Sequence, residues 1–135
     1  MTPGPHDPTL PPMHKDLHTL LAYALSLPEA TEHHPWGDIA VKIAGKKTFV
    51  FMSGGRSGTG CAITAKLPES GHAVLAVHEF ASPAGYNLGK SGWVHACFEA
   101  DEDAPAELLK SWIDESWRAN APKSLVKAHS GAVVR

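Results

Sequence analysis

The sequence has no apolar run approaching the roughly 20 residues that a membrane-spanning helix needs. Residues 1–12 contain five prolines and lack the apolar core of a secretory signal, so we expect a soluble, cytoplasmic protein. Cysteine is scarce, with Cys61 and Cys97 alone, both on expected strands. A disulfide between them is possible in principle. Because nothing in the sequence indicates export to an oxidising compartment, we expect two free thiols.

Metal-binding motifs are also lacking. His14 and His18 stand four residues apart, but Lys15 occupies the position where a zinc-protease helix has glutamate, so we expect both histidines on a solvated helix face. His33 and His34 form a loop pair, with adventitious metal binding as the alternative. The acidic turn at residues 101–103 lacks the alternation and the glycine of a calcium loop. The sequence therefore predicts no metal site.

Two catalytic motifs are incomplete. The run Gly89-Lys90-Ser91 has the end of a phosphate-binding loop, but Ala84 stands where that motif needs glycine. In the run at 55–59, Thr59 replaces the final glycine of a nucleophile elbow. We therefore predict a non-enzymatic protein with no catalytic residues and no cofactor.

What the chain does contain is the pattern of one globular domain, with 43% hydrophobic and 19% charged residues. Residues 37–66 predict three antiparallel strands, at 39–44, 48–52 and 61–66, with a tight loop at Gly45-Lys46 and a glycine-rich loop at 53–60. A fourth strand is expected at 92–99, and the loop at 82–91 has room for a brief strand. Apolar stripes predict helices at 14–27, 69–80 and about 105–120, with one or two further turns after Pro122.

This order predicts an α+β fold of two layers, an antiparallel β-sheet of about five strands packed on helices. The buried stripe of the second helix is expected at Ala73, Val74, Val77 and Phe80 or Ala81. We expect residues 1–12 to be a disordered proline-rich leader, 13–129 a single domain and 130–135 a flexible tail.

Charge is unevenly distributed along the chain, although the net charge is −2. Residues 39–68 contain four lysines and one arginine with no acidic residue, and residues 116–135 contain four basic residues with no acidic one. The segments 1–38 and 69–115 are strongly acidic. A basic surface opposed to an acidic one is therefore expected.

Five segments carry a family resemblance through their order and spacing. They are LSLP at 25–28, PWG at 35–37, residues 39–52 with the GKK turn at 45–47, YNLGKSGWV at 86–94 and LLKSWIDESW at 108–117. With them, the chain resembles the MmcQ/YjbR-like proteins over about residues 16–128. That family consists of small bacterial proteins labelled as predicted DNA-binding.

The resemblance implies a compact α+β unit, similar to secretion-chaperone-like folds. The family's DNA-binding label rests on a pair of hairpins called a "double wing". The first wing would be the turn at 45–47 with the loop at 53–60, and the second the loop at 86–93. Phosphate contacts would come from Lys42, Lys46, Lys47, Arg56, Lys66 and Lys90. Stacking, or a ligand pocket, would come from Trp36, Tyr86, Asn87 and Trp93.

Weak DNA binding through two basic hairpin loops is therefore the leading prediction. The alternatives are a protein-interaction module, chaperone-like and dimeric, and a binder of small anionic ligands in which Lys90 lies beside aromatic rings.

Overall fold

The computed structural model describes residues 13–35, 38–85 and 88–133, and of residues 130–133 it describes the backbone alone. The expected leader at 1–12 and the candidate residues Trp36, Tyr86 and Asn87 lie outside the described residues. The elements follow in the order α1 (Lys15–Leu25), β1 (Ala30–His33), β2 (Ile39–Ile43), β3 (Lys47–Ser53), β4 (Cys61–Lys66), α2 (Gly71–Val77), β5 (Ala81–Pro83), the 3-10 helix η2 (Leu88–Ser91), β6 (Trp93–Phe98), α3 (Ala106–Asn120) and α4 (Lys123–Val133).

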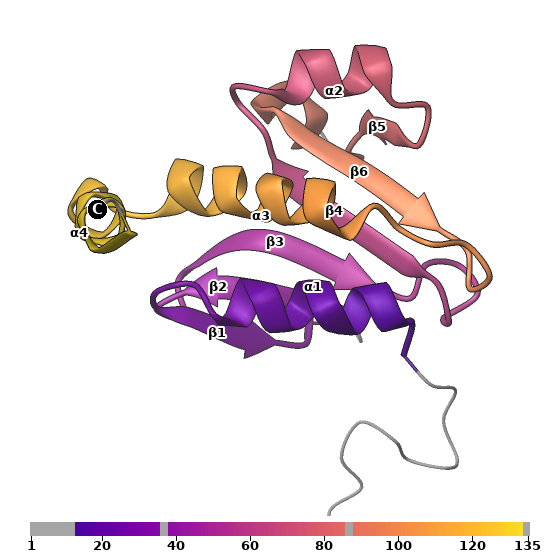
Figure 1. The fold of residues 1–135 in the computed structure, drawn as a ribbon, viewed down its shortest axis with the longest axis horizontal. Helices are drawn as coiled ribbons and strands as arrows, with labels where there is room; N and C mark the ends of the chain where they lie inside the picture. Colours follow the sequence, from indigo (N-terminus) through magenta and orange to yellow (C-terminus); the bar gives the residue numbers. More distant parts are fainter. Residues whose placement is uncertain (1–12, 36–37, 86–87, 134–135) are drawn as a thin grey trace, which may run out of the picture.

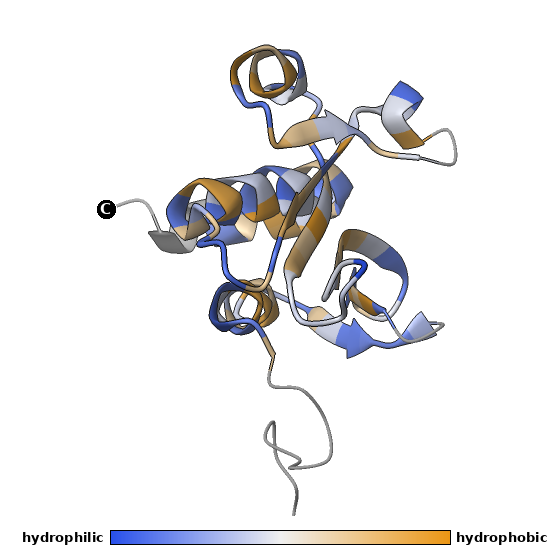
Figure 2. Cartoon of the chain, turned by 90° about the vertical axis from the view of Figure 1, so that its right-hand side faces the viewer, coloured by the Kyte–Doolittle hydropathy of each residue, from blue (hydrophilic) through white to orange (hydrophobic). Residues whose placement is uncertain are grey.

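Within the described residues, six strands form one antiparallel sheet in the order β1-β2-β3-β4-β6-β5 (Figure 1). The predicted α+β class is confirmed, with six strands where about five were expected. The strand that the sequence did not reveal is β1, in which Ala30 pairs with Ile43 and His33 with Ala40. This edge strand has no apolar alternation, and Figure 2 shows it in hydrophilic colours beside hydrophobic central strands.

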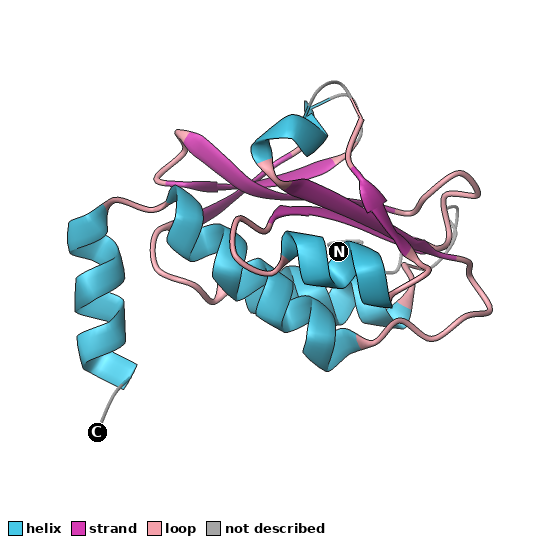
Figure 3. Ribbon diagram, turned by 90° about the horizontal axis from the view of Figure 1, so that it is seen from above, coloured by secondary structure: helices cyan, strands magenta, loops and turns pink. Residues whose placement is uncertain are grey.

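Helices α1, α2 and α3 cover one face of the sheet, whereas η2 lies on the other (Figure 3). The apolar stripes predicted for α1 and α3 are confirmed, because their buried residues form one cluster with the inward side chains of the strands. Each large side chain buried there stabilises the fold by roughly 1.5–3 kcal/mol. The cluster includes Leu17, Leu20, Leu21, Ile39, Val41, Val50, Met52, Ile63, Val94, Leu109, Trp112, Ile113 and Trp117.

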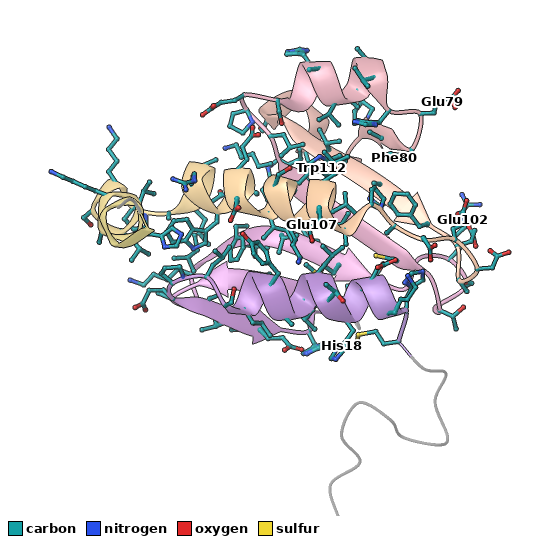
Figure 4. The ribbon with its side chains drawn as sticks, viewed as in Figure 1. His18, Glu79, Phe80, Glu102, Glu107 and Trp112 are labelled. Carbon is teal, nitrogen blue, oxygen red and sulfur yellow. The ribbon has the colours of Figure 1, made fainter. Side chains whose placement is uncertain are left out.

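The N-terminus of α1 shows that one expectation about the histidines was wrong. His14 is buried, whereas His18 is exposed as expected and lies on the outer side of α1 (Figure 4). The His14 Nδ1 accepts a hydrogen bond from the Asp16 N–H at 3.0 Å, and Nε2 lies 2.8 Å from the Glu102 carbonyl oxygen. Since a carbonyl can only accept, Nε2 carries the proton. His14 therefore caps the helix and ties it to the loop before α3.

Helix α2 is shorter than the predicted range 69–80 at both ends, and its expected buried stripe was partly wrong. Val74 is buried, but Ala73 is exposed and Val77 is 70% exposed. Phe80 follows the helix and turns toward the core, with its ring centroid 5.1 Å from that of Phe98 and 6.3 Å from that of Trp112 (Figure 4). The periodic pattern counted Phe80 as helical, although the chain bends into β5 before it.

Candidate nucleic-acid interface

The hairpin turn between β2 and β3 places two lysines at one end of the sheet. The Lys46 N–H donates to the Ile43 carbonyl at 3.0 Å, which closes a turn with Ala44 and Gly45 at its centre. Their φ angles of 54° and 70° are both left-handed, as a type I′ hairpin requires. The loop between the paired residues Ile43 and Lys47 is therefore residues 44–46, and the centre of its turn lies one position earlier than predicted. Lys46 is the last residue of this loop and Lys47 the first of β3, and both side chains are exposed.

Arg56 lies in the loop between β3 and β4, at the other end of β3 from that turn (Figure 1). A strand of seven residues separates them by roughly 20 Å. Arg56 has acidic neighbours. Burial raises the pKa of the nearby Cys97 thiol most, the charges of Glu99 and Glu102 raise it further, and the charge of Arg56 lowers it. The structure therefore does not bring together the two parts expected to form the first wing.

The second acid-free segment of the sequence supplies the end of α3 and all of α4. These elements lie at the same end of the molecule as the β2–β3 turn (Figures 1 and 3). The Trp117 and His129 rings meet edge to face with centroids 5.0 Å apart, and Leu125 packs against the core. Lys123 and Lys127 are exposed. Sequence reasoning missed these two lysines as site residues, although the charge pattern contained the signal.

We call Lys46, Lys47, Lys123 and Lys127 the basic end. Glu29 adds one exposed acidic side chain beside it, because the Glu29 carbonyl accepts the Ala44 N–H at 2.7 Å. The loop before α3 lies at the opposite end of the molecule, where Figure 4 labels Glu102. That loop contains Asp101, Glu102 and Asp103, all exposed. The molecule is therefore basic at one end and acidic at the other.

Lys42 and Lys66 lie on strands and are half-buried. Lys42 pairs with Thr48 across β2 and β3, and Lys66 pairs with Trp93 across β4 and β6. Each alternates with residues buried under the helices, so both point to the uncovered face of the sheet. On that face, the Phe51 and Trp93 ring centroids lie 5.8 Å apart at 52°. The protein-interaction prediction would use this face, and it stays a prediction.

Lys90 and Trp93 do lie together, on a hollow of about 380 Å³ between η2 and α2. Lys90 is exposed, whereas Trp93 is only 9% exposed, so its ring is packed against neighbours instead of being presented flat to solvent. The other two residues expected in this pocket, Tyr86 and Asn87, lie outside the described residues.

The two cysteines are free, as expected. Cys61 is buried beneath the helices, and burial raises its pKa to about 12. Cys97 is exposed on the neighbouring strand and lies opposite Ala62 in the register, so it points to the other face.

In the part of the chain that the structure describes, no three His, Cys, Asp or Glu side chains are grouped so that they could hold a metal ion. None of the described helices is both long enough and apolar enough to cross a membrane.

Comparison with known proteins agrees with this architecture. A family model described as YjbR matches residues 25–119. The solved structure of the Deinococcus radiodurans protein DR2400, which carries a DUF419 domain, is similar with a TM-score of 0.60 and 21% identity, over 79% of this chain and 81% of that one. At that identity the likeness concerns the fold. No curated protein matches the chain significantly. The family match spans well over half of the chain, from the end of α1 almost to the end of α3, and the protein therefore belongs to the YjbR family.

Proposed function

We propose that this protein binds nucleic acid weakly through its basic end. The observation that carries the proposal is the convergence of two acid-free segments, far apart in the sequence, at one end of the fold (Figure 1). Four exposed lysines from a hairpin turn and a helix can neutralise backbone phosphates and release condensed counterions. The YjbR family membership is compatible with this proposal but does not test it.

The charges elsewhere on the molecule support weak and oriented binding. The net charge of −2 opposes strong association with a polyanion. The exposed carboxylates of Asp101, Glu102 and Asp103 repel phosphate at the other end, so that the basic end faces the nucleic acid. Lys42 and Lys66 extend the proposed surface onto the uncovered face of the sheet, where their half-buried side chains reach less far.

Fluorescence anisotropy of labelled duplex DNA against the protein, titrated at several salt concentrations, tests the proposal. If four phosphates are engaged, the logarithm of the association constant should fall against the logarithm of salt with a slope of about −3 to −4. Lys46→Glu/Lys47→Glu should lower affinity at least tenfold at low salt and reduce the slope toward about −2.

Arg56→Glu provides the matched control for Lys46→Glu, because both variants change the charge by the same amount at an exposed loop. Arg56→Glu should leave the affinity within about twofold of the original, since Arg56 lies at the opposite end of β3. Absence of binding at low salt would overturn the proposal. An equal loss of affinity in the single variants Lys46→Glu and Arg56→Glu would also overturn it.

A further inference from the structure

We propose that the hollow between α2 and the start of β6 is a binding site for a small organic anion with an apolar body. Its volume of about 380 Å³ falls within the range of roughly 300–1,000 Å³ that is usual for small-molecule sites. It is separate from the basic end, because its walls come from the end of β4, the start of β6, the first turns of α2 and η2.

The walls of this hollow are held by backbone hydrogen bonds. The Leu67 N–H donates to the Gly92 carbonyl at 2.8 Å, which ties the end of β4 to the start of β6. The Gly71 N–H then donates to the Leu67 carbonyl at 3.0 Å, which fixes where α2 begins. Gly92 has a φ of 87°, a conformation that L side chains rarely adopt. A β-carbon at Gly71 would lie 3.6 Å from the Leu67 β-carbon and 3.7 Å from a Val94 methyl, both in residues that line the hollow.

The chemistry of the lining is that of an anion site with an apolar wall. Lys90, His72 and Ser91 supply a cation and polar hydrogen-bonding groups, and all three are exposed enough to meet a ligand. Leu75 and Trp93 supply the apolar part of the lining. The lining contains no acidic residue. A carboxylate or phosphate would therefore face Lys90 while its hydrocarbon part contacts the wall.

Two other hollows of similar size have the opposite character. One, of about 320 Å³, lies across Pro68 and is lined by Glu69, Asp114 and Glu115 with Arg118. The other, of about 340 Å³, lies at the acidic end and includes Asp101, Glu102 and Asp103 with Lys15. The Lys15 ammonium is already paired with Asp103 at 2.9 Å. Among these three hollows of the described residues, the α2–η2 hollow alone combines a cation with an acid-free lining.

Titration of the ¹⁵N-labelled full chain with phenyl phosphate and with benzoate, followed by amide chemical shifts, tests the site. Benzyl alcohol serves as the uncharged probe of similar shape. Either anion should shift the amides of residues 71–75 and 89–94 in a saturable manner, and benzyl alcohol should bind at least tenfold more weakly. The stronger of the two anions identifies a phosphate or a carboxylate as the preferred head group.

Two variants and a control keep the test specific. Lys90→Gln should weaken the anions about tenfold, and Leu75→Trp should fill the hollow and weaken all three probes. Arg56→Gln, which removes a cation at the far end of the sheet, should leave every affinity unchanged. The proposal fails if millimolar anion shifts no amide around the hollow. It also fails if benzyl alcohol binds as well as the anions, or if Lys90→Gln and Arg56→Gln have equal effects.

Discussion

Ser116 connects helix α3 to two strands at the point where the sheet is irregular. Phe49 is the extra residue of a β-bulge, since Val50 pairs with Val41 and Thr48 pairs with Lys42. The Ser116 hydroxyl donates to the Phe49 carbonyl and accepts the Lys66 N–H at 2.8 Å. Ser116 is fully buried. A single hydroxyl thus satisfies one backbone acceptor and one backbone donor on neighbouring strands.

Ser116→Ala should therefore destabilise the protein by about 1.5–5.5 kcal/mol. Each backbone group left without its partner costs about 1–3 kcal/mol, and the higher helix propensity of alanine returns roughly 0.5 kcal/mol. Because domains of this kind are stable by only about 5–15 kcal/mol, the loss is large. It should appear as a lower urea midpoint, with an unchanged m-value, in unfolding followed by tryptophan fluorescence.

Ser111→Ala on the same helix is the matched control. Ser111 is exposed, and its hydroxyl donates only within the helix, to the Leu108 carbonyl. Its replacement should change the free energy of unfolding by less than about 0.5 kcal/mol. Faster hydrogen exchange of the Lys66 amide in Ser116→Ala would locate the loss. A cost below about 1 kcal/mol for Ser116→Ala would refute this account of the bulge.

Two further predictions concern pH and the hairpin turn. Burial and the hydrogen bonds from the Tyr23 hydroxyl to Asp114, both at 2.7 Å, raise the pKa of Tyr23 to about 12. Since the pKa of tyrosine in the unfolded chain is about 10, the folded state holds more protons between pH 10 and 12. The free energy of unfolding should therefore fall as the pH rises through that window. Urea unfolding at several pH values should show a less steep fall for Tyr23→Phe. Ala44→Asn should raise the free energy of unfolding by about 0.5–1 kcal/mol, because Ala44 occupies a left-handed conformation that asparagine tolerates better; a lower melting temperature would contradict this.

Local pattern was sufficient for most of the fold. Strand β4 was predicted from its sequence at the residues where it occurs, and α3 ends at Asn120 as expected. Both have a periodic apolar pattern that faces the core. Strand β1 has none, because it pairs at the sheet edge with half-exposed side chains, and its position depends on β2 instead of on its own residues. The burial of His14 likewise depends on a carbonyl 88 residues away, which no local pattern contains.

The glycine-rich loop between β3 and β4 shows the same limit. Its composition predicted a flexible connection, but the Gly60 N–H donates to the Gly54 carbonyl at 2.8 Å and closes the loop on itself. A β-carbon at Gly60 would lie 2.3 Å from the carbonyl oxygen of Phe98 on β6. Glycine is therefore required there by the close approach of the Phe98 backbone, which the composition of the loop does not reveal.

The candidate site depended on the direction of α3, which charge counting could not supply. At 1.5 Å per residue this helix of 15 residues spans about 22 Å, close to the length of β3, so it carries the basic C-terminal segment back to the β2–β3 turn. Part of the charge polarity has a structural explanation, since acidic Glu107 in the first turn and basic Arg118 in the last turn complement the helix dipole. That explanation covers α3 and does not extend to Lys46 and Lys47, which lie on a hairpin. Reversal of those two charges therefore separates a binding role from helix stabilisation more cleanly than any change in the C-terminal segment.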